Sequence, residues 1–154
     1  MKGEDKDPII DLIHAFQRTF VISRQSGAPA EGMIPFNPLN FHLISLLHAQ
    51  GELRPTAITQ ALDIPKTTLS TALSSLIRRG LLIKTPDPSD GRASLIRLSE
   101  AGQQVAVAIQ RQEQKISALI LQTAEPHERE DLLLACQQLS RVIGKLAAQS
   151  KSSQ

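Results

Sequence analysis

The sequence of 154 residues has one cysteine, no tryptophan, no tyrosine and four phenylalanines. A single cysteine excludes a disulfide framework and a cysteine-rich zinc site. The scarcity of aromatic residues argues against recognition of single-stranded nucleic acid, which relies on aromatic stacking platforms. No stretch approaches the ~20 apolar residues of a membrane helix, and the acidic start MKGEDKDP is not followed by the apolar segment of a signal peptide. We therefore expect a cytoplasmic protein with no membrane contact.

Catalytic and metal-binding motifs are also missing from the sequence. It contains no glycine-rich phosphate loop, no G-x-S-x-G and no H-x-x-x-H pair. The four histidines are scattered along the chain, at His14, His42, His48 and His127. We therefore expect no enzyme activity, no cofactor and no bound metal.

The charged residues are unevenly distributed along a chain of globular composition, 41% hydrophobic and 21% charged. Residues 53–98 hold seven basic and three acidic side chains, a net charge of +4, whereas residues 1–52 carry −2 and residues 99–154 carry zero. A basic module of this kind is typical of a protein that binds a phosphate backbone. A solvated surface that happens to be basic would give the same count.

Three segments with helical apolar periodicity flank this basic module. The first covers residues 8–25, with Ile9, Ile13, Phe16 and Phe20 on one face. The second covers 99–122, with Ser99 as its N-cap. The third covers 126–148 and carries a heptad seam, formed by Leu132, Cys136, Leu139, Ile143 and Leu146. A seam this short indicates packing on other helices, within or between subunits. Residues 26–38 form a Pro- and Gly-rich loop, and we expect a disordered tail over 149–154.

The basic module begins with three further helical segments. Asn37-Pro38 is an N-cap followed by proline at the first helical position, and this helix ends at Gln50-Gly51. A short helix runs from Pro55 to about Leu62. The third runs from about Lys66 to Arg79 and stops at Gly80.

The third of these segments has two different faces. Its apolar face holds Leu69, Leu73, Leu76 and Ile77, and its polar face holds Lys66, Thr67, Ser70, Thr71, Ser74 and Arg78. Six hydroxyl residues among 67–75 are unusual for a plain surface helix, because they compete with the helical backbone for hydrogen bonds. Short hydroxyl side chains let a helix approach base edges closely. The pattern therefore predicts a helix-turn-helix with this segment as its recognition helix.

A β-hairpin follows the predicted recognition helix. Residues 81–85 and 94–98 are the predicted strands, and the turn PDPSDGR between them places Asp90-Gly91 at the tip. A hairpin in this position is a wing. Arg92 lies just past the tip, where it can enter a minor groove.

The run GLLIKTPDPSDGRASLIRLSEAGQ, residues 80–103, resembles the wing signature of the multiple-antibiotic-resistance-regulator (MarR) family. The matching parts are Arg79-Gly80-Leu81-Leu82, Asp87 to Arg92, and Leu98 to Gly102. The resemblance implies a dimeric winged helix that regulates transcription, with its first, fifth and sixth helices in the dimer interface. It also implies a pocket for a small-molecule effector. Two residues depart from the family pattern: Gly91 replaces a basic residue, and Pro65 replaces a capping serine.

Together, the pattern and the resemblance predict three groups of functional residues. For DNA binding they are Lys66, Thr67, Thr68, Ser70, Thr71, Ser74, Arg78, Lys84, Asp90 and Arg92, with the Asp90 carboxylate holding the Arg92 guanidinium as in similar proteins. For the dimer interface they are Ile9, Ile13, Phe16, Leu132, Cys136, Leu139, Ile143 and Leu146. For the effector pocket, which the resemblance implies, they are His14, Met33, Phe36 and His42, although each residue is more typical of an ordinary core or interface position.

The predicted fold is mainly α with a small β-wing: one domain over 1–154, in which a winged helix-turn-helix (37–98) is flanked by dimerisation helices. The predicted function is a dimeric, sequence-specific regulator of transcription that represses. Its helix at about 66–79 would enter the major groove of a pseudo-palindromic duplex, and its wing, 82–98, the minor groove. The alternative is a winged-helix module that binds proteins and has no sequence-specific DNA binding. Selection of binding sites from random duplexes distinguishes the two.

Overall fold

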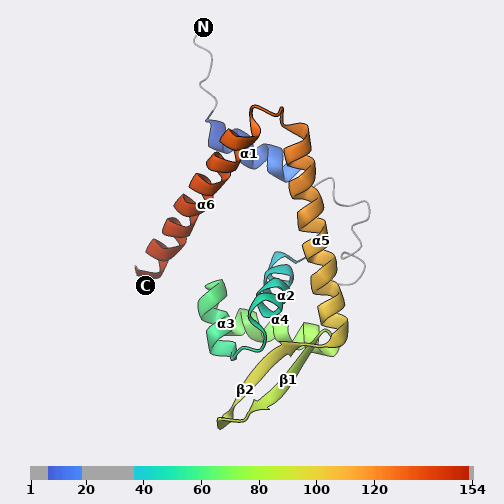
Figure 1. Cartoon of the computed structure of the whole chain (residues 1–154). Coiled ribbons are helices and arrows are strands. Elements are labelled where there is room, and N and C mark those ends of the chain that lie inside the picture. Colours follow the sequence, from blue (N-terminus) through green and yellow to red (C-terminus); the bar gives the residue numbers. More distant parts are fainter. Residues whose placement is uncertain (1–6, 19–36, 153–154) are drawn as a thin grey trace. The chain divides into compact units, whose positions relative to one another are not determined.

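The computed structural model describes residues 7–18 and 37–152 of the chain. Its elements, in chain order, are α1 (Pro8–Phe16), α2 (Pro38–Gln50), α3 (Pro55–Leu62), α4 (Lys66–Arg78), β1 (Leu82–Asp87), β2 (Asp90–Leu98), α5 (Glu100–Thr123) and α6 (Arg129–Ser152). Figure 1 shows these elements, and the mainly helical fold with a small β-wing agrees with the prediction.

The chain divides into two compact units, Met1–Asn37 and Pro38–Gln154. In the first unit, the Asp7 carboxylate accepts a hydrogen bond of 2.9 Å from the backbone N–H of Ile9 and so caps α1. The predicted helix over 8–25 is confirmed as far as Phe16, and its part beyond residue 18 lies outside the described residues, as does most of the predicted loop. That both units form one domain stays a prediction.

The core of the second unit is built by the apolar faces of α2 to α5 together with β2. Its fully buried side chains are Leu43, Ile44, Leu47, Ile58, Leu69, Leu76, Ile96 and Val105. α5 packs on α2 through its first half, where Val105 and Ile109 are buried, whereas Leu119 and Ile120 in its second half are exposed. The core therefore supports the helix-turn-helix and leaves the far end of α5 uncovered.

α4 ends at Arg78, one residue before the predicted end. Gly80 adopts a φ of 73°, and its N–H donates to the carbonyl of Ile77 over 2.8 Å. This left-handed conformation is one that glycine adopts without a steric penalty. The chain leaves the helix there and enters the first strand of the wing two residues later.

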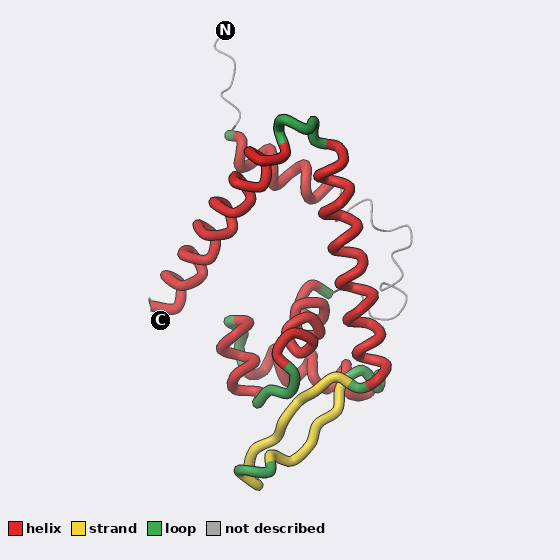
Figure 2. The backbone as a smooth tube through the Cα atoms, in the orientation of Figure 1, coloured by secondary structure: helices red, strands yellow, loops and turns green. Residues whose placement is uncertain are grey.

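The wing is a two-stranded antiparallel sheet in which Leu82 pairs with Leu98 and Asp87 with Asp90 (Figure 2). The predicted tip, Asp90-Gly91, is wrong: the turn is Pro88-Ser89, and both strands are longer than predicted. The reason is the side chain of Asp87. Its Oδ1 accepts hydrogen bonds from the N–H of Ser89 at 2.8 Å and from its hydroxyl at 2.7 Å, which closes the turn two residues earlier.

The base of the wing is held by an isolated β-bridge. Leu53, between α2 and α3, exchanges two backbone hydrogen bonds with Ile96, of 3.0 and 2.8 Å. The segment that leads into α3 is thereby joined to the wing by backbone hydrogen bonds.

The start of α5 presses against the chain just after α4. The N–H of Ser99 donates to the carbonyl of Leu81 at 3.0 Å, and its hydroxyl donates to the carbonyl of Gly80 at 2.6 Å. The same hydroxyl oxygen accepts from the N–H of Gly102 at 3.0 Å and caps α5, as predicted. A Cβ at Gly102 would overlap the carbonyl oxygen of Leu81. Only glycine therefore fits at the last position of the L-S-x-x-G motif.

The bounds of α6 differ from the prediction at both ends. The helix begins at Arg129 instead of 126, because the carboxylate of Glu128 accepts the N–H of Glu125 at 3.0 Å and holds residues 125–128 in a turn. The helix continues to Ser152, so the predicted disordered tail is helical over 149–152. No proline follows Gly144 to stop the helix, and Ala147 and Ala148 favour its continuation.

We predict that Gly102→Ala destabilises the protein by about 3 kcal/mol, because the clash is with backbone that cannot move aside without breaking the Ser99 contacts. Gly91→Ala is the matched control, since nothing lies within 4 Å of a Cβ there and its φ is not positive. Urea unfolding of both variants measures the difference. Equal stability of the two variants would show that the contact at Leu81 is not restrictive.

Candidate nucleic-acid interface

The polar face of α4 is exposed along its whole length. Leu69, Ala72, Leu73 and Leu76 turn into the core, which leaves the other face in solvent. That face carries the side chains predicted from the sequence for DNA contact, Lys66, Thr67, Thr68, Ser70, Thr71, Ser74 and Arg78. The helix thus offers a row of short hydroxyl groups with a cation at each end.

The N-terminus of α4 has no side-chain cap. Pro65 is the N-cap residue and makes no capping hydrogen bond, in contrast to a serine in this position. The first intrahelical bond runs from Leu69 to the carbonyl of Pro65 at 3.1 Å, so the backbone N–H groups of the first turn remain for an external acceptor. With Lys66 beside them, they favour an anion.

The hydroxyl group of Thr71 donates a hydrogen bond within the helix. Its Oγ1 donates to the carbonyl of Thr67 over 3.1 Å. The oxygen lone pairs and the methyl group remain for a ligand. Thr71 is therefore suited to accept from a base amino group or to contact a thymine methyl.

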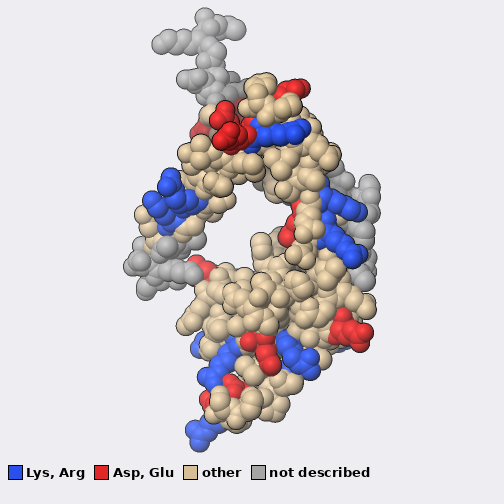
Figure 3. All heavy atoms as spheres, viewed as in Figure 1, with Lys and Arg blue, Asp and Glu red and all other residues tan. Residues whose placement is uncertain are grey.

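The wing adds further cations to the same module. Lys84, Arg92 and Arg97 are exposed on the two strands. Figure 3 shows Lys and Arg side chains interspersed with carboxylates over the wing, at the lower end of the view. The cations of α4 and of the wing belong to one compact unit.

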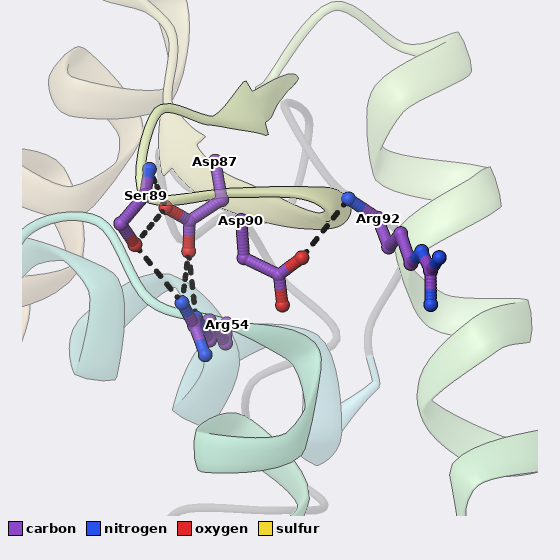
Figure 4. Close-up of polar contacts among 5 residues, drawn as sticks. All are labelled: Arg54, Asp87, Ser89, Asp90 and Arg92. Carbon is purple, nitrogen blue, oxygen red and sulfur yellow. Dashed lines mark hydrogen bonds and ion pairs between the residues drawn. The ribbon is translucent and has the colours of Figure 1, made fainter.

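Arg54 forms an ion pair with Asp87 close to the wing tip (Figure 4). Both Nε and Nη2 of the guanidinium lie 2.6 Å from Asp87 Oδ2, and Nη2 also donates to Ser89 Oγ at 3.2 Å. The Asp87 side chain is 5% exposed and that of Arg54 45%. Hydrogen bonds from the hydroxyl and backbone of Ser89, followed by the contact with Arg54, outweigh burial and lower the pKa of Asp87 from 3.8 to about 2.

The predicted contact between the Asp90 carboxylate and the Arg92 guanidinium is wrong. Asp90 Oδ1 accepts instead from the backbone N–H of Arg92 at 3.1 Å, and the guanidinium points away from it (Figure 4). The N–H two residues ahead is the nearest donor that an aspartate at the start of a strand can reach. The sequence analysis missed Arg54 and Asp87 as partners because 33 residues separate them and no local pattern links them.

The predicted effector-pocket residues fall in separate parts of the chain. His14 is exposed on α1 and His42 on α2, in different units, while Met33 and Phe36 lie outside the described residues. A hollow of about 450 Å³ lies at the turn between α3 and α4 instead, lined by Thr59, Gln60, Asp63, Ile64, Pro65 and Lys66. The effector pocket stays a prediction.

The residues predicted for the dimer interface are largely exposed in the single chain. On α1, Ile9, Ile13 and Phe16 are 59%, 48% and 55% exposed. On α6, Leu132 is half-buried and the rest of the predicted seam is exposed, together with Leu133, Leu134 and Val142. The apolar surface of α6 is thus broader than the predicted heptad seam.

No three or more His, Cys, Asp or Glu side chains among the described residues gather in an arrangement that could hold a metal ion. None of the helices described in 7–18 and 37–152 is both long and apolar enough to span a membrane.

Comparison with known proteins gives a family match and similar folds. Residues 34–93 match the model of the MarR family. The structure of RV1404 from Mycobacterium tuberculosis has a TM-score of 0.72 at 18% identity, covering 92% of this chain and 96% of that one. FabT from Streptococcus pneumoniae, solved in complex with DNA, has a TM-score of 0.78 at 17% identity, covering 90% and 96%. BpsR from Bordetella bronchiseptica has a TM-score of 0.62 at 21% identity, covering 87% and 99%. No curated protein sequence matches the chain.

We predict that Ser89→Ala and Arg54→Met each raise the pKa of Asp87 towards 3.8, because each variant removes a hydrogen bond to the ionised carboxylate. A carbon-detected NMR titration of the Asp87 carboxyl group measures both shifts.

Because the pKa of Asp87 is lowered on folding, its stabilising effect is fully present above pH 3.8 and is lost as the pH falls through about 2. The parent should therefore lose more stability than Asp87→Asn between pH 4 and pH 2. An unchanged pKa of Asp87 in both Ser89→Ala and Arg54→Met, or equal acid sensitivity of parent and Asp87→Asn, would contradict this assignment.

Proposed function

Since residues 34–93 of this chain belong to the MarR family, we propose that the protein is a homodimeric, sequence-specific DNA-binding regulator of transcription that acts as a repressor in the cytoplasm. The observation that carries the proposal is the exposed, hydroxyl-lined face of α4 beside a basic wing. In this arrangement α4 enters the major groove and the wing reaches the adjacent minor groove. The role is regulatory and not enzymatic.

The solved structures of similar fold support the proposal in two ways. FabT is described in complex with DNA, and so is MepR of Staphylococcus aureus. For BpsR, regulation of DNA binding by 6-hydroxynicotinic acid is described. We propose that a small-molecule effector regulates this chain as well, and the chemistry of that effector is left open.

The function is tested by selecting binding sites from random duplexes with the full chain at low salt. We expect a pseudo-palindromic sequence to be enriched, because a dimer with two-fold symmetry presents two copies of α4. If no sequence is enriched, the protein is a winged-helix interaction module and the proposal fails.

On the selected site, residues that contact bases and residues that contact phosphates should behave differently. Thr71→Ala should change the sequence preference, by about 1–3 kcal/mol at the affected base pair. Lys84→Ala should weaken binding to all sequences alike and reduce the slope of log K against log salt by about one unit. Lys115→Ala, at an exposed position of α5, is the control and should change neither the sequence preference nor the salt dependence. Identical behaviour of Thr71→Ala and Lys84→Ala across sites would disprove this division of roles.

The dimer is proposed because α1 and α6 each expose several large apolar side chains, which a soluble protein normally covers. Leu139 and Ile143 are 37% and 54% exposed. Replacement of either with Asp should convert the dimer to monomer or aggregate, whereas Gln137→Asp, an exposed polar position on the same helix, should leave it dimeric. Light scattering at low micromolar concentration measures the mass. A folded, soluble monomer of the parent chain would rule out the dimer.

A further inference from the structure

Arg54 occupies the position before α3 where a capping side chain normally stands. It is the N-cap residue of that helix, yet its side chain makes no capping hydrogen bond. The guanidinium extends instead to the far end of the wing, to Asp87 and Ser89 (Figure 4). The side chain thus links the helix-turn-helix to the wing tip.

Asp87 uses both carboxylate oxygens in this contact. Oδ2 accepts from Arg54, and Oδ1 accepts from the N–H and the hydroxyl of Ser89. The turn Pro88-Ser89 and the contact with Arg54 therefore depend on the same carboxylate. A displacement of the tip breaks the hydrogen bonds to Arg54, whereas those between Asp87 and Ser89 move with the turn.

The wing has two attachments to the segment that leads into α3. At its base, the backbone of Leu53 pairs with Ile96, which itself lies opposite Lys84. Asp87 lies three residues farther along β1, at about 3.3 Å per residue. A two-stranded ribbon is marginally stable by itself and twists easily. The contact at Asp87 is thus what restrains its outer half.

We propose that Arg54 is a positioning residue for the wing: its ion pair with Asp87 and its hydrogen bond to Ser89 hold the tip at the orientation in which Arg92 reaches DNA. This inference rests on the proposed DNA-binding function. The partly exposed ion pair contributes little to global stability, so its loss acts on binding. The pair also cancels a negative charge that would otherwise face the DNA phosphates.

The isosteric variant Asp87→Asn tests the proposal, since its amide oxygen can still accept from Ser89 while the ion pair with Arg54 is lost. Removal of a carboxylate near DNA would by itself strengthen binding. If Arg54 positions the wing, the loss of the ion pair weakens binding instead. We expect the affinity for the selected duplex to fall at least fivefold. Glu52→Gln is the matched control: it removes an exposed acid two residues before Arg54 and should bind as tightly as the parent or more tightly.

A double-mutant cycle with Arg92 separates positioning from direct contact. Arg92→Ala should lower the affinity about tenfold in the parent and less than threefold in the Asp87→Asn background, because a released wing no longer presents Arg92. Equal losses in both backgrounds, or tighter binding of Asp87→Asn than of the parent, would overturn the proposal.

Hydrogen exchange without DNA gives an independent readout. The amides of residues 85–92 should exchange faster in Asp87→Asn, and those of α4 should not change. In Arg54→Lys these amides should exchange at a rate between those of the parent and of Asp87→Asn, since a lysine retains the charge but not the second donor to Ser89. If the wing amides exchange at the same rate in all variants, the contacts of Arg54 do not restrain the wing. If the parent binds no duplex at all, the proposed function fails regardless of the exchange result.

Discussion

The close approach of α5 to the backbone at Leu81 holds together the three elements of the proposed DNA-binding surface. The carbonyl of Leu81 accepts the N–H of Ser99, and the hydroxyl of Ser99 reaches the carbonyl of Gly80 at the end of α4. Gly102 allows this approach because it has no Cβ to meet the Leu81 carbonyl. The end of α4, the start of β1 and the start of α5 therefore move as one body, and the angle between the recognition helix and the wing is set there.

The outer half of the wing depends on a second set of contacts. Backbone pairing of Leu53 with Ile96 attaches the base, and the ion pair of Arg54 with Asp87 attaches the tip. Two consecutive residues of one short segment thus restrain both ends of the hairpin. Such restraint lowers the entropy lost when the wing enters a groove, which links the fold of this module to its proposed affinity for DNA.

The position of the wing tip was predicted wrongly because two aspartates in this stretch, Asp87 and Asp90, can each close a turn. The sequence analysis placed the tip at Asp90-Gly91, because Asp-Gly is a strong turn signal. The Asp87 carboxylate closes the turn at Pro88-Ser89 instead, since Arg54 holds that carboxylate from another part of the chain. Local propensity predicts that both Asp87 and Asp90 can close a turn, and the ion pair with a residue 33 positions away adds to the contacts that favour Asp87.

The helices of the second unit, their buried faces, the exposed hydroxyl face of α4 and the cap at Ser99 could all be predicted from the sequence, because each depends on periodicity or on neighbours within four residues. The resemblance to the MarR family, whose model matches residues 34–93, followed from the wing motif for the same reason. The ion pair of Arg54 with Asp87 and the clash that makes Gly102 necessary could not be predicted. Each joins side chain or backbone from elements that only the folded chain brings within a few ångströms, and hydrogen bonds and steric overlap act at no longer range.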